Sequence, residues 1–259
     1  MPEGDTLFRT AAGLRPHLVG REVTAARATR PGPQIERVVG KEIRSVEALG
    51  KNLLIRFDGD LELRTHLRMN GSWHRYRPGE RWRRPPSRAR LVLEVPGAVA
   101  VCFDAPVVEL FEERAQALHP ALASLGPDLL APDFDAAEAL RRLRAPERRD
   151  LSISAALLDQ RALAGIGNIW RNETLFAERV DPLARVADLD EDTLRRLVAT
   201  ARRLLTASAG IAPGRSAPMH VYRRTGRPCP RCGTAIRSDQ LRGENPRTTY
   251  WCPTCQARA

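Results

Sequence analysis

The fold of the first half of this chain is decided by the stretch Leu53-Leu54-Ile55-Arg56-Phe57-Asp58-Gly59-Asp60-Leu61-Glu62-Leu63-Arg64-Thr65. Apolar residues alternate up to Asp58-Gly59 and alternate again beyond it, which is the pattern of two strands joined by a tight turn. The pattern recurs on both sides of Pro96-Gly97, in 91–95 and 99–103. We therefore expect residues 21 to about 110 to form antiparallel β structure, either a sandwich or a flattened barrel.

Helical patterns flank this β half. Before it, Leu7, Ala11, Leu14 and Leu18 recur at helical spacing. After it, proline and glycine mark a linker, and the apolar spacing then predicts four helices, over 137–143, 153–163, 168–178 and around 194–205, the last stopped at Gly210.

These patterns predict an α+β protein with two domains. An N-terminal antiparallel β-sandwich with a leading helix should precede a helical domain and a short, basic, cysteine-paired segment. The expected boundaries are 1–122 for the β-sandwich domain, 123–135 for the linker, 136–220 for the helical domain and 221–259 for the last segment.

The charge balance favours nucleic acid as the partner. The 259 residues include 42 Lys+Arg against 31 Asp+Glu, a formal net charge of +11. An anionic membrane is the second candidate class, but no apolar run is long enough to cross a bilayer and no apolar signal region opens the chain. We expect a soluble intracellular protein.

Two cysteine pairs near the C-terminus predict a metal site. Cys229-x-x-Cys232 and Cys252-x-x-Cys255 are nineteen residues apart, so they offer the four thiolates that one structural Zn²⁺ binds tetrahedrally. A redox dithiol is the alternative, and Cys102 is left over in a strand-like run. The loop held by the metal, 234–251, would present arginine to phosphate, through Arg237, Arg242 and Arg247.

The chain begins Met1-Pro2-Glu3-Gly4, which makes a reactive amine conceivable. Once Met1 is removed, Pro2 exposes a secondary amine that can attack an electrophilic carbon and form an iminium. The start of a helix disfavours positive charge there, which lowers the pKa of such an amine and leaves more of it nucleophilic. Proline is also simply a good helix starter, which is the structural alternative.

Three further motifs indicate a function only when they are considered together. Gly165-Ile166-Gly167-Asn168 can expose backbone N–H groups to a phosphate at a helix start, where Asn168 could cap the helix or donate to the phosphate. Taken alone, the motif is better explained by plain helix-turn packing. Lys51 follows Gly50 at the mouth of a strand and is a functional candidate only if it lies near Pro2. Met69, within His66–Gly71, is either core filler or a wedge between bases.

Taken in their order along the chain, these motifs resemble the formamidopyrimidine-DNA glycosylase and endonuclease VIII family of base-excision repair enzymes. The likeness spans essentially the whole chain. The Pro-Glu-Gly opening is similar to the endonuclease VIII branch, whose members mostly remove oxidised pyrimidines, and most similar to its second actinobacterial type. The resemblance implies that residues 136–220 form a helix-two-turns-helix domain and that 221–259 form a zinc-finger β-hairpin.

The resemblance also implies a role for each matched residue. Pro2 would attack C1′ of the damaged nucleotide with Glu3 as general acid, and strand cleavage would follow by β,δ-elimination. Lys51 would bind phosphate and assist proton transfer, Arg247 would grip phosphates, and Asn168 would hold the backbone beside the lesion. The hole left by the flipped base would be occupied by Arg68, Met69 and Asn70.

This chain departs from the family at the two wedge residues, at Ser124 and in the nineteen-residue spacer of the finger. It has Asp104-Ala105-Pro106 where the formamidopyrimidine branch carries an Arg-x-Phe pair. We expect a DNA glycosylase/AP lyase that acts on damaged double-stranded DNA, with single-stranded and bubble DNA as further candidates. A non-catalytic zinc-finger protein that binds damaged or branched DNA is the main alternative, and an RNA-binding module is the third. Only Pro2-Glu3 with Lys51 favours catalysis.

Overall fold

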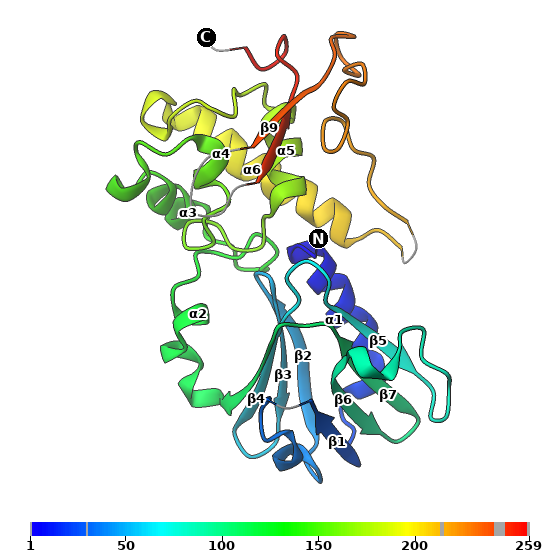
Figure 1. The fold of residues 1–259 in the computed structure, drawn as a ribbon. Coiled ribbons are helices and arrows are strands. Elements are labelled where there is room, and N and C mark those ends of the chain that lie inside the picture. The colour runs from blue at the N-terminus through cyan, green and yellow to red at the C-terminus, as the bar shows by residue number, and fades with distance from the viewer. Residues whose placement is uncertain (1, 30, 213–214, 241–246, 258–259) are drawn as a thin grey trace. The chain divides into compact units, whose positions relative to one another are not determined.

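The computed structural model of the chain describes residues 2–29, 31–212, 215–240 and 247–257. The chain divides into two compact units, Met1–Ser124 and Leu125–Ala259, and each is described by itself (Figure 1). Among the described residues, no helix combines the length and apolar character that a bilayer crossing needs.

The first unit is a sandwich of two four-stranded antiparallel sheets with a helix in front. One sheet has the strand order β2-β3-β4-β8 and the other β1-β6-β7-β5. The helices are α1 (Gly4–Leu18) and α2 (Pro120–Ala123). Short 3-10 helices lie at Ile35–Val38 and Pro86–Arg88, and a longer 3-10 helix spans Glu113–Leu118. The strands are β1 (Ala25–Ala28), β2 (Ile43–Leu49), β3 (Asn52–Phe57), β4 (Leu61–His66), β5 (Ser72–Tyr76), β6 (Ala89–Val95), β7 (Ala98–Phe103) and β8 (Val107–Glu112).

Both predicted hairpins are confirmed. Phe57 pairs with Leu61 across the Asp58-Gly59 turn, and Val95 pairs with Ala98 across Pro96-Gly97. The eight strands form two separate four-stranded sheets, so the predicted sandwich is confirmed.

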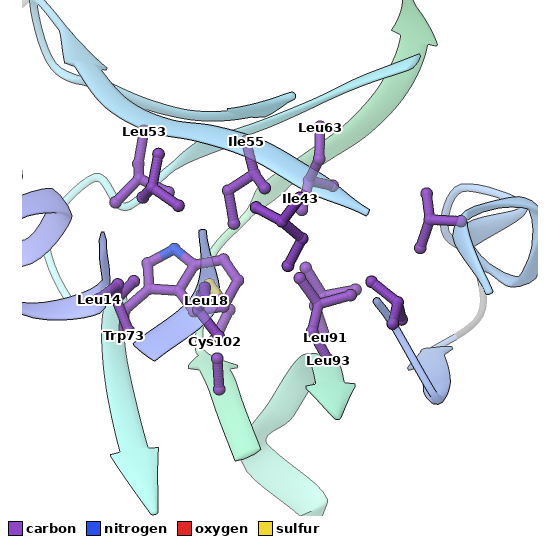
Figure 2. Close-up of a cluster of buried hydrophobic side chains, with 14 of the residues drawn as sticks. Leu14, Leu18, Ile43, Leu53, Ile55, Leu63, Trp73, Leu91, Leu93 and Cys102 are labelled. Atoms are coloured by element: carbon purple, nitrogen blue, oxygen red, sulfur yellow. The ribbon is translucent and has the colours of Figure 1, made fainter. Parts of the chain in front are cut away.

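The core of this unit lies between the two sheets (Figure 2). Leu53, Ile55 and Leu63 come from one sheet, and Leu91, Leu93 and Cys102 from the other, because alternate residues of a strand point to the same face. Leu14 and Leu18 of α1 close the same cluster. Each such fully buried side chain contributes about 1.5–3 kcal/mol to folding, which holds α1 against the sheets.

Helix α1 runs back along β2. Its end lies at the start of that strand, where the Gly20 amide donates to Ile43 O at 2.9 Å, and Arg15 Nη2 reaches Val46 O at 2.9 Å. The start of α1 therefore lies towards the β2–β3 turn, and Figure 1 shows both at the same end of the unit.

The second unit is helical and ends in a two-stranded hairpin. Its helices are α3 (Ala136–Leu143), α4 (Ile153–Ala156), α5 (Asn168–Ala177) and α6 (Glu191–Ala209), and its strands are β9 (Arg237–Gln240) and β10 (Thr248–Trp251). Asp135 and Asp190 cap α3 and α6 through the Glu138 and Thr193 amides, and α6 ends at Gly210 as the sequence predicts. A single apolar cluster joins α3, α4, α5 and α6.

The helix predicted over 153–163 is wrong beyond its first turn, because α4 ends at Ala156. After Ala156, side chains form hydrogen bonds with backbone groups that a continuing helix would have paired with each other. Asp159 Oδ1 accepts from the Arg161 amide at 2.9 Å. Gln160 accepts from the Gly165 amide at 3.1 Å and donates to Ile166 O at 3.0 Å. These bonds turn the chain towards the start of α5.

Candidate active site and metal centre

Pro2 and Glu3 are held at the start of α1. Glu3 is the N-cap in extended conformation, and its carbonyl accepts from the Thr6 and Leu7 amides at 3.0 and 3.1 Å. Pro2 is half-buried and Glu3 is 0% exposed. A buried carboxylate at a helix start is stabilised by the helix dipole. Met1, whose removal would free the amine, lies outside the described residues.

The β2–β3 turn carries Lys51. Gly50 adopts φ +58°, which favours glycine, and Asn52 Nδ2 donates to Leu49 O at 3.1 Å to close the turn. His66 pairs with Asn52 across the sheet. Burial, then Arg64 and then Lys51, lower the pKa of His66 to about 4. Because Asn52 pairs with His66, the turn that carries Lys51 lies beside this imidazole.

Strand register places three loops at this end of the sandwich. Asn52, His66 and Val107 are neighbours across β3, β4 and β8, and Ser72 and Phe103 are neighbours across β5 and β7. The turn 49–52, the loop 66–72 and the turn 103–107 consequently share one end of the unit. The start of α1 lies towards the same end, so Pro2, Lys51 and Met69 gather there although 66 residues separate the first from the last.

The loop after β4 presents Met69. Its side chain is 56% exposed, and Arg68 beside it has φ +46°. The Gly71 amide donates to Leu67 O at 2.9 Å, and a Cβ on Gly71 would lie 2.6 Å from that oxygen, so this tight loop requires glycine. Arg84 Nη1 donates to Asn70 O at 3.1 Å. Met69 is thus an exposed apolar side chain on a loop that hydrogen bonds hold in place.

In the second unit, α5 is bonded to the finger hairpin. Asn168 Nδ2 and Arg171 Nη2 both donate to Thr248 O, at 3.1 and 3.2 Å, and the Tyr250 amide donates to Asn172 Oδ1 at 2.8 Å. Arg247 directly precedes Thr248, so it lies beside the start of α5. The predicted capping role of Asn168 is wrong, because the N-cap is Gly167 and Asn168 is already helical.

The four paired cysteines converge. Their sulfurs all lie within 4.8 Å of one another, with Cys229 and Cys255 Sγ at 3.9 Å and Cys232 and Cys252 Sγ at 3.4 Å. Amides of Arg231 and Cys255 donate to cysteine sulfurs at 3.4 Å, which favours thiolates. Hydrogen bonds from Thr234 lower the pKa of Cys232 to about 6. This donor set fits one structural Zn²⁺, as the sequence predicts.

Of the finger's other predicted arginines, Arg237 begins β9 and is exposed, whereas Arg242 lies outside the described residues. The finger is tied to α5 by Glu173, a buried carboxylate that accepts from the amides of His220, Val221 and Tyr222 at 2.9 to 3.0 Å.

Three family models match the chain. They are the formamidopyrimidine-DNA glycosylase N-terminal domain over residues 1–106, the formamidopyrimidine-DNA glycosylase H2TH domain over 125–217 and the zinc finger found in FPG and IleRS over 226–258. The chain belongs to the formamidopyrimidine-DNA glycosylase family. Its two units are therefore the family's N-terminal domain, and its helix-two-turns-helix domain followed by the zinc finger.

Relatives of this glycosylase-family chain include "Probable endonuclease 8 2" of Streptomyces coelicolor, 40% identical over 264 residues that cover 99% of this chain and 94% of the relative. "DNA-(apurinic or apyrimidinic site) lyase Nei2" of Mycolicibacterium smegmatis is 39% identical over 265 residues, 99% of each chain. The fold is that of Lactococcus lactis Fpg in a complex with abasic-site DNA, with a TM-score of 0.84 at 23% identity over 99% of this chain and 100% of that one.

Sequence reasoning missed two groups in this glycosylase-family structure. One is Arg171 with Asn172, both 0% exposed, which join α5 to the hairpin. No sequence signal marks this group, because Arg203 of α6 likewise has no acidic residue three or four positions away on its helix and is exposed. The other is Arg84 with Asp104, twenty residues apart, which no local sequence pattern marks either.

Proposed function

We propose that this protein is a bifunctional DNA glycosylase and AP lyase of base-excision repair that removes oxidised bases, mainly pyrimidines, and nicks the strand by β,δ-elimination. The observation that carries the proposal is the Pro2-Glu3 pair, with a half-buried proline beside a fully buried carboxylate at the start of an anchored helix. The relatives named as endonuclease 8 2 and as an AP lyase support it.

In the proposed reaction the Pro2 nitrogen attacks C1′ of the damaged nucleotide. The N–C1′ bond forms as the glycosidic bond breaks and the base leaves with a proton, and Glu3 supplies general acid catalysis that opens the sugar ring. The resulting iminium acidifies C2′. Loss of that proton expels the 3′ phosphate, a second elimination expels the 5′ phosphate, and water then hydrolyses the imine and frees Pro2. The zinc takes no part in these steps.

The remaining site residues would bind and hold DNA. Lys51, at the same end of the sandwich as the start of α1, would pair with a phosphate and assist proton transfer. Asn168 and Arg247, which lie together where α5 meets the hairpin, would bind the phosphate backbone of the DNA. Arg68, Met69 and Asn70 would fill the gap that a flipped base leaves, since an exposed methionine on a braced loop can enter a base stack.

The proposed substrate is damaged double-stranded DNA, and the enzyme would act as a monomer on the nucleoid in the bacterial cytoplasm. Solved Fpg relatives in complexes with damaged DNA support a DNA partner. Single-stranded and bubble DNA would be tested beside the duplex.

Borohydride trapping tests the chemistry. The protein without Met1 should form a covalent adduct with an abasic-site duplex, and peptide mapping should place the adduct on Pro2. Lysine offers the matched control, because Lys41 and Lys51 are the only two in the chain. The variant Lys41→Gln/Lys51→Gln should still give an N-terminal adduct, although more slowly.

A form with one extra residue before Pro2 should bind the duplex but give no adduct, because the nitrogen is then an amide. If the protein with a free Pro2 binds abasic DNA and never crosslinks, the proposal fails and the non-catalytic DNA-binding alternative replaces it.

A further inference from the structure

Residues 77–90, which we call the arginine arm, run from the end of β5 into the first two residues of β6. The arm contains six arginines and a single glutamate. Tyr76 pairs with Val99, and Ala89 pairs with Phe103, so the arm leaves the sheet at one end and returns at the other. Its return end is the end that carries Lys51 and Met69. The arm thus spans the length of the second sheet.

The arm is packed on the sheet by aromatic contacts. The ring of Trp82 stacks on Tyr76, with centroids 6.1 Å apart, and meets Phe103 edge-on at 5.7 Å. The Arg83 amide donates to Tyr76 Oη at 3.0 Å. Trp82 thereby covers the outer apolar cluster of this sheet. The positions of the arm's arginines are consequently set by the fold.

Arg84 ties the arm to the loop that carries Met69, and the Asp104 carboxylate holds Arg84 in place. Asp104 accepts from Arg84 Nη1 at 2.5 Å and from Arg88 Nε at 2.8 Å, and Arg84 also reaches Asn70 O. Burial opposes the charged form of Asp104, but hydrogen bonds from Arg88 and Arg84 outweigh it and hold its pKa below the ordinary value. The carboxylate stays ionised, so arm and loop remain joined.

The arm keeps an excess of positive charge beside Arg84, the residue that contacts the Met69 loop at Asn70 O. Its ion pairs involve Arg84 and Arg88, whereas the side chains of Arg81 and Arg83 are exposed and form no ion pair with any carboxylate in the described ranges. Burial, then Arg84 and Arg83, lower the pKa of the neighbouring His74. The local field is therefore positive and carried by arginine.

We propose that the arginine arm is a second DNA-binding surface of the first unit, in which Arg81 and Arg83 bind backbone phosphates next to the gap that Met69 fills. The inference rests on the proposed function, because that function brings DNA to the loop 68–71. Arginine binds phosphate through a planar fork of donors, and such contacts add affinity without reading sequence. Trp82, the arm's one large apolar residue, is packed inward, which favours a polyanion over a membrane surface.

The test is the salt dependence of DNA binding by Arg81→Gln/Arg83→Gln. Both side chains are exposed, so the variant should fold. The matched control is Arg37→Gln/Arg114→Gln, which removes the same charge from two exposed arginines of the same unit. Kd would be measured for a duplex with an uncleavable abasic analogue, for the corresponding single strand and for an RNA duplex.

For the arm variant we expect the slope of log Kd against log salt concentration to fall by about 1.8, since each lost phosphate contact removes about 0.9. Affinity for the duplex should fall at least about tenfold at 0.1 M salt, and the control should keep most of its affinity and its slope. An unchanged slope, or an equal loss in the control, would overturn the proposal. Tighter binding of the RNA duplex with the same dependence on the arm would overturn the assignment of DNA as partner.

Trapping separates this inference from the proposed function. With saturating abasic duplex, the arm variant should give the same final yield of borohydride adduct as the unmodified protein. If neither protein forms an adduct but the arm variant alone loses affinity, the proposed chemistry is wrong and the arm remains a DNA-binding surface.

Discussion

Arg64 Nε donates to Asn52 Oδ1 at 2.9 Å across strands β4 and β3. Arg64 is 6% exposed and Asn52 is 3% exposed. Asn52 in turn closes the turn that carries Lys51, and the other side of Arg64 pairs with Glu109, which also bonds His119 Nε2 at 3.1 Å. The buried Arg64–Asn52 contact therefore supports the turn that carries Lys51, and the partly exposed Glu109 and His119 extend the chain of polar contacts.

Arg64→Met should slow the reaction while leaving DNA binding nearly unchanged. Loss of the Nε–H bond lets Asn52 and the Lys51 turn move, and a displacement of about 1 Å can cost about 100-fold in rate. We expect single-turnover imine formation to fall about 10- to 100-fold with Kd within about twofold. Arg64→Lys, which keeps the charge but lacks the fork, should recover little. Equal rates for all three proteins would exclude a positioning role.

Glu62 should make stability fall as pH rises. The side chain is fully buried, and burial raises its pKa in spite of the hydrogen bond from Arg56 at 2.8 Å. The folded state then holds the Glu62 proton more tightly than the unfolded state. The destabilisation caused by burying the ionised Glu62 is absent below the pKa of the unfolded state, about 4.3, and complete above the pKa of the folded state.

Urea unfolding at a series of pH values checks this. Glu62→Gln should gain stability relative to the unmodified protein as pH rises above about 4.3, because glutamine keeps an acceptor for Arg56 and has no charge to bury. A difference between the two proteins that does not change with pH would show that Glu62 does not titrate in this way.

Cys252→Ser should release zinc and abolish DNA binding. Cys252 is 0% exposed in a small cluster with Phe176, Val221 and Ile236, so the short finger depends on the metal for its core. Atomic absorption should show less than one equivalent of zinc, and the β-rich unit should still unfold cooperatively. Cys102→Ala, in the core of that unit, is the control that should keep its zinc. Full DNA affinity in the zinc-free variant would remove the finger from the binding site.

Arg247→Ala should weaken DNA binding by one phosphate contact. The residue precedes Thr248, whose carbonyl is held by Asn168 and Arg171. We expect the salt slope to fall by about 0.9. Arg195→Ala, an exposed arginine of α6 that pairs with Glu191 and Asp192, should leave the slope as it is. If Arg247→Ala leaves the salt slope of DNA binding unchanged, Arg247 does not contact a DNA phosphate.

The sequence by itself determined the parts of this protein that depend on near neighbours. Alternation around Asp58-Gly59 and Pro96-Gly97 predicted both hairpins, because a strand buries every second residue. The spacing of four cysteines predicted the zinc site, since coordination geometry restricts it. Gly210 marked the end of the long helix. The motif order indicated the family.

Only the tertiary structure decided which distant groups meet. The predicted helix over 153–163 failed because side chains of Asp159 and Gln160 bond backbone groups of a turn that folds back on them. Arg64 with Asn52, Arg171 with Thr248 and Arg84 with Asp104 depend on strand register and on the packing of separate elements. A buried polar group has no water to bond, so it needs a hydrogen-bond partner within the protein. Only the tertiary structure determines which distant residue lies close enough to be that partner.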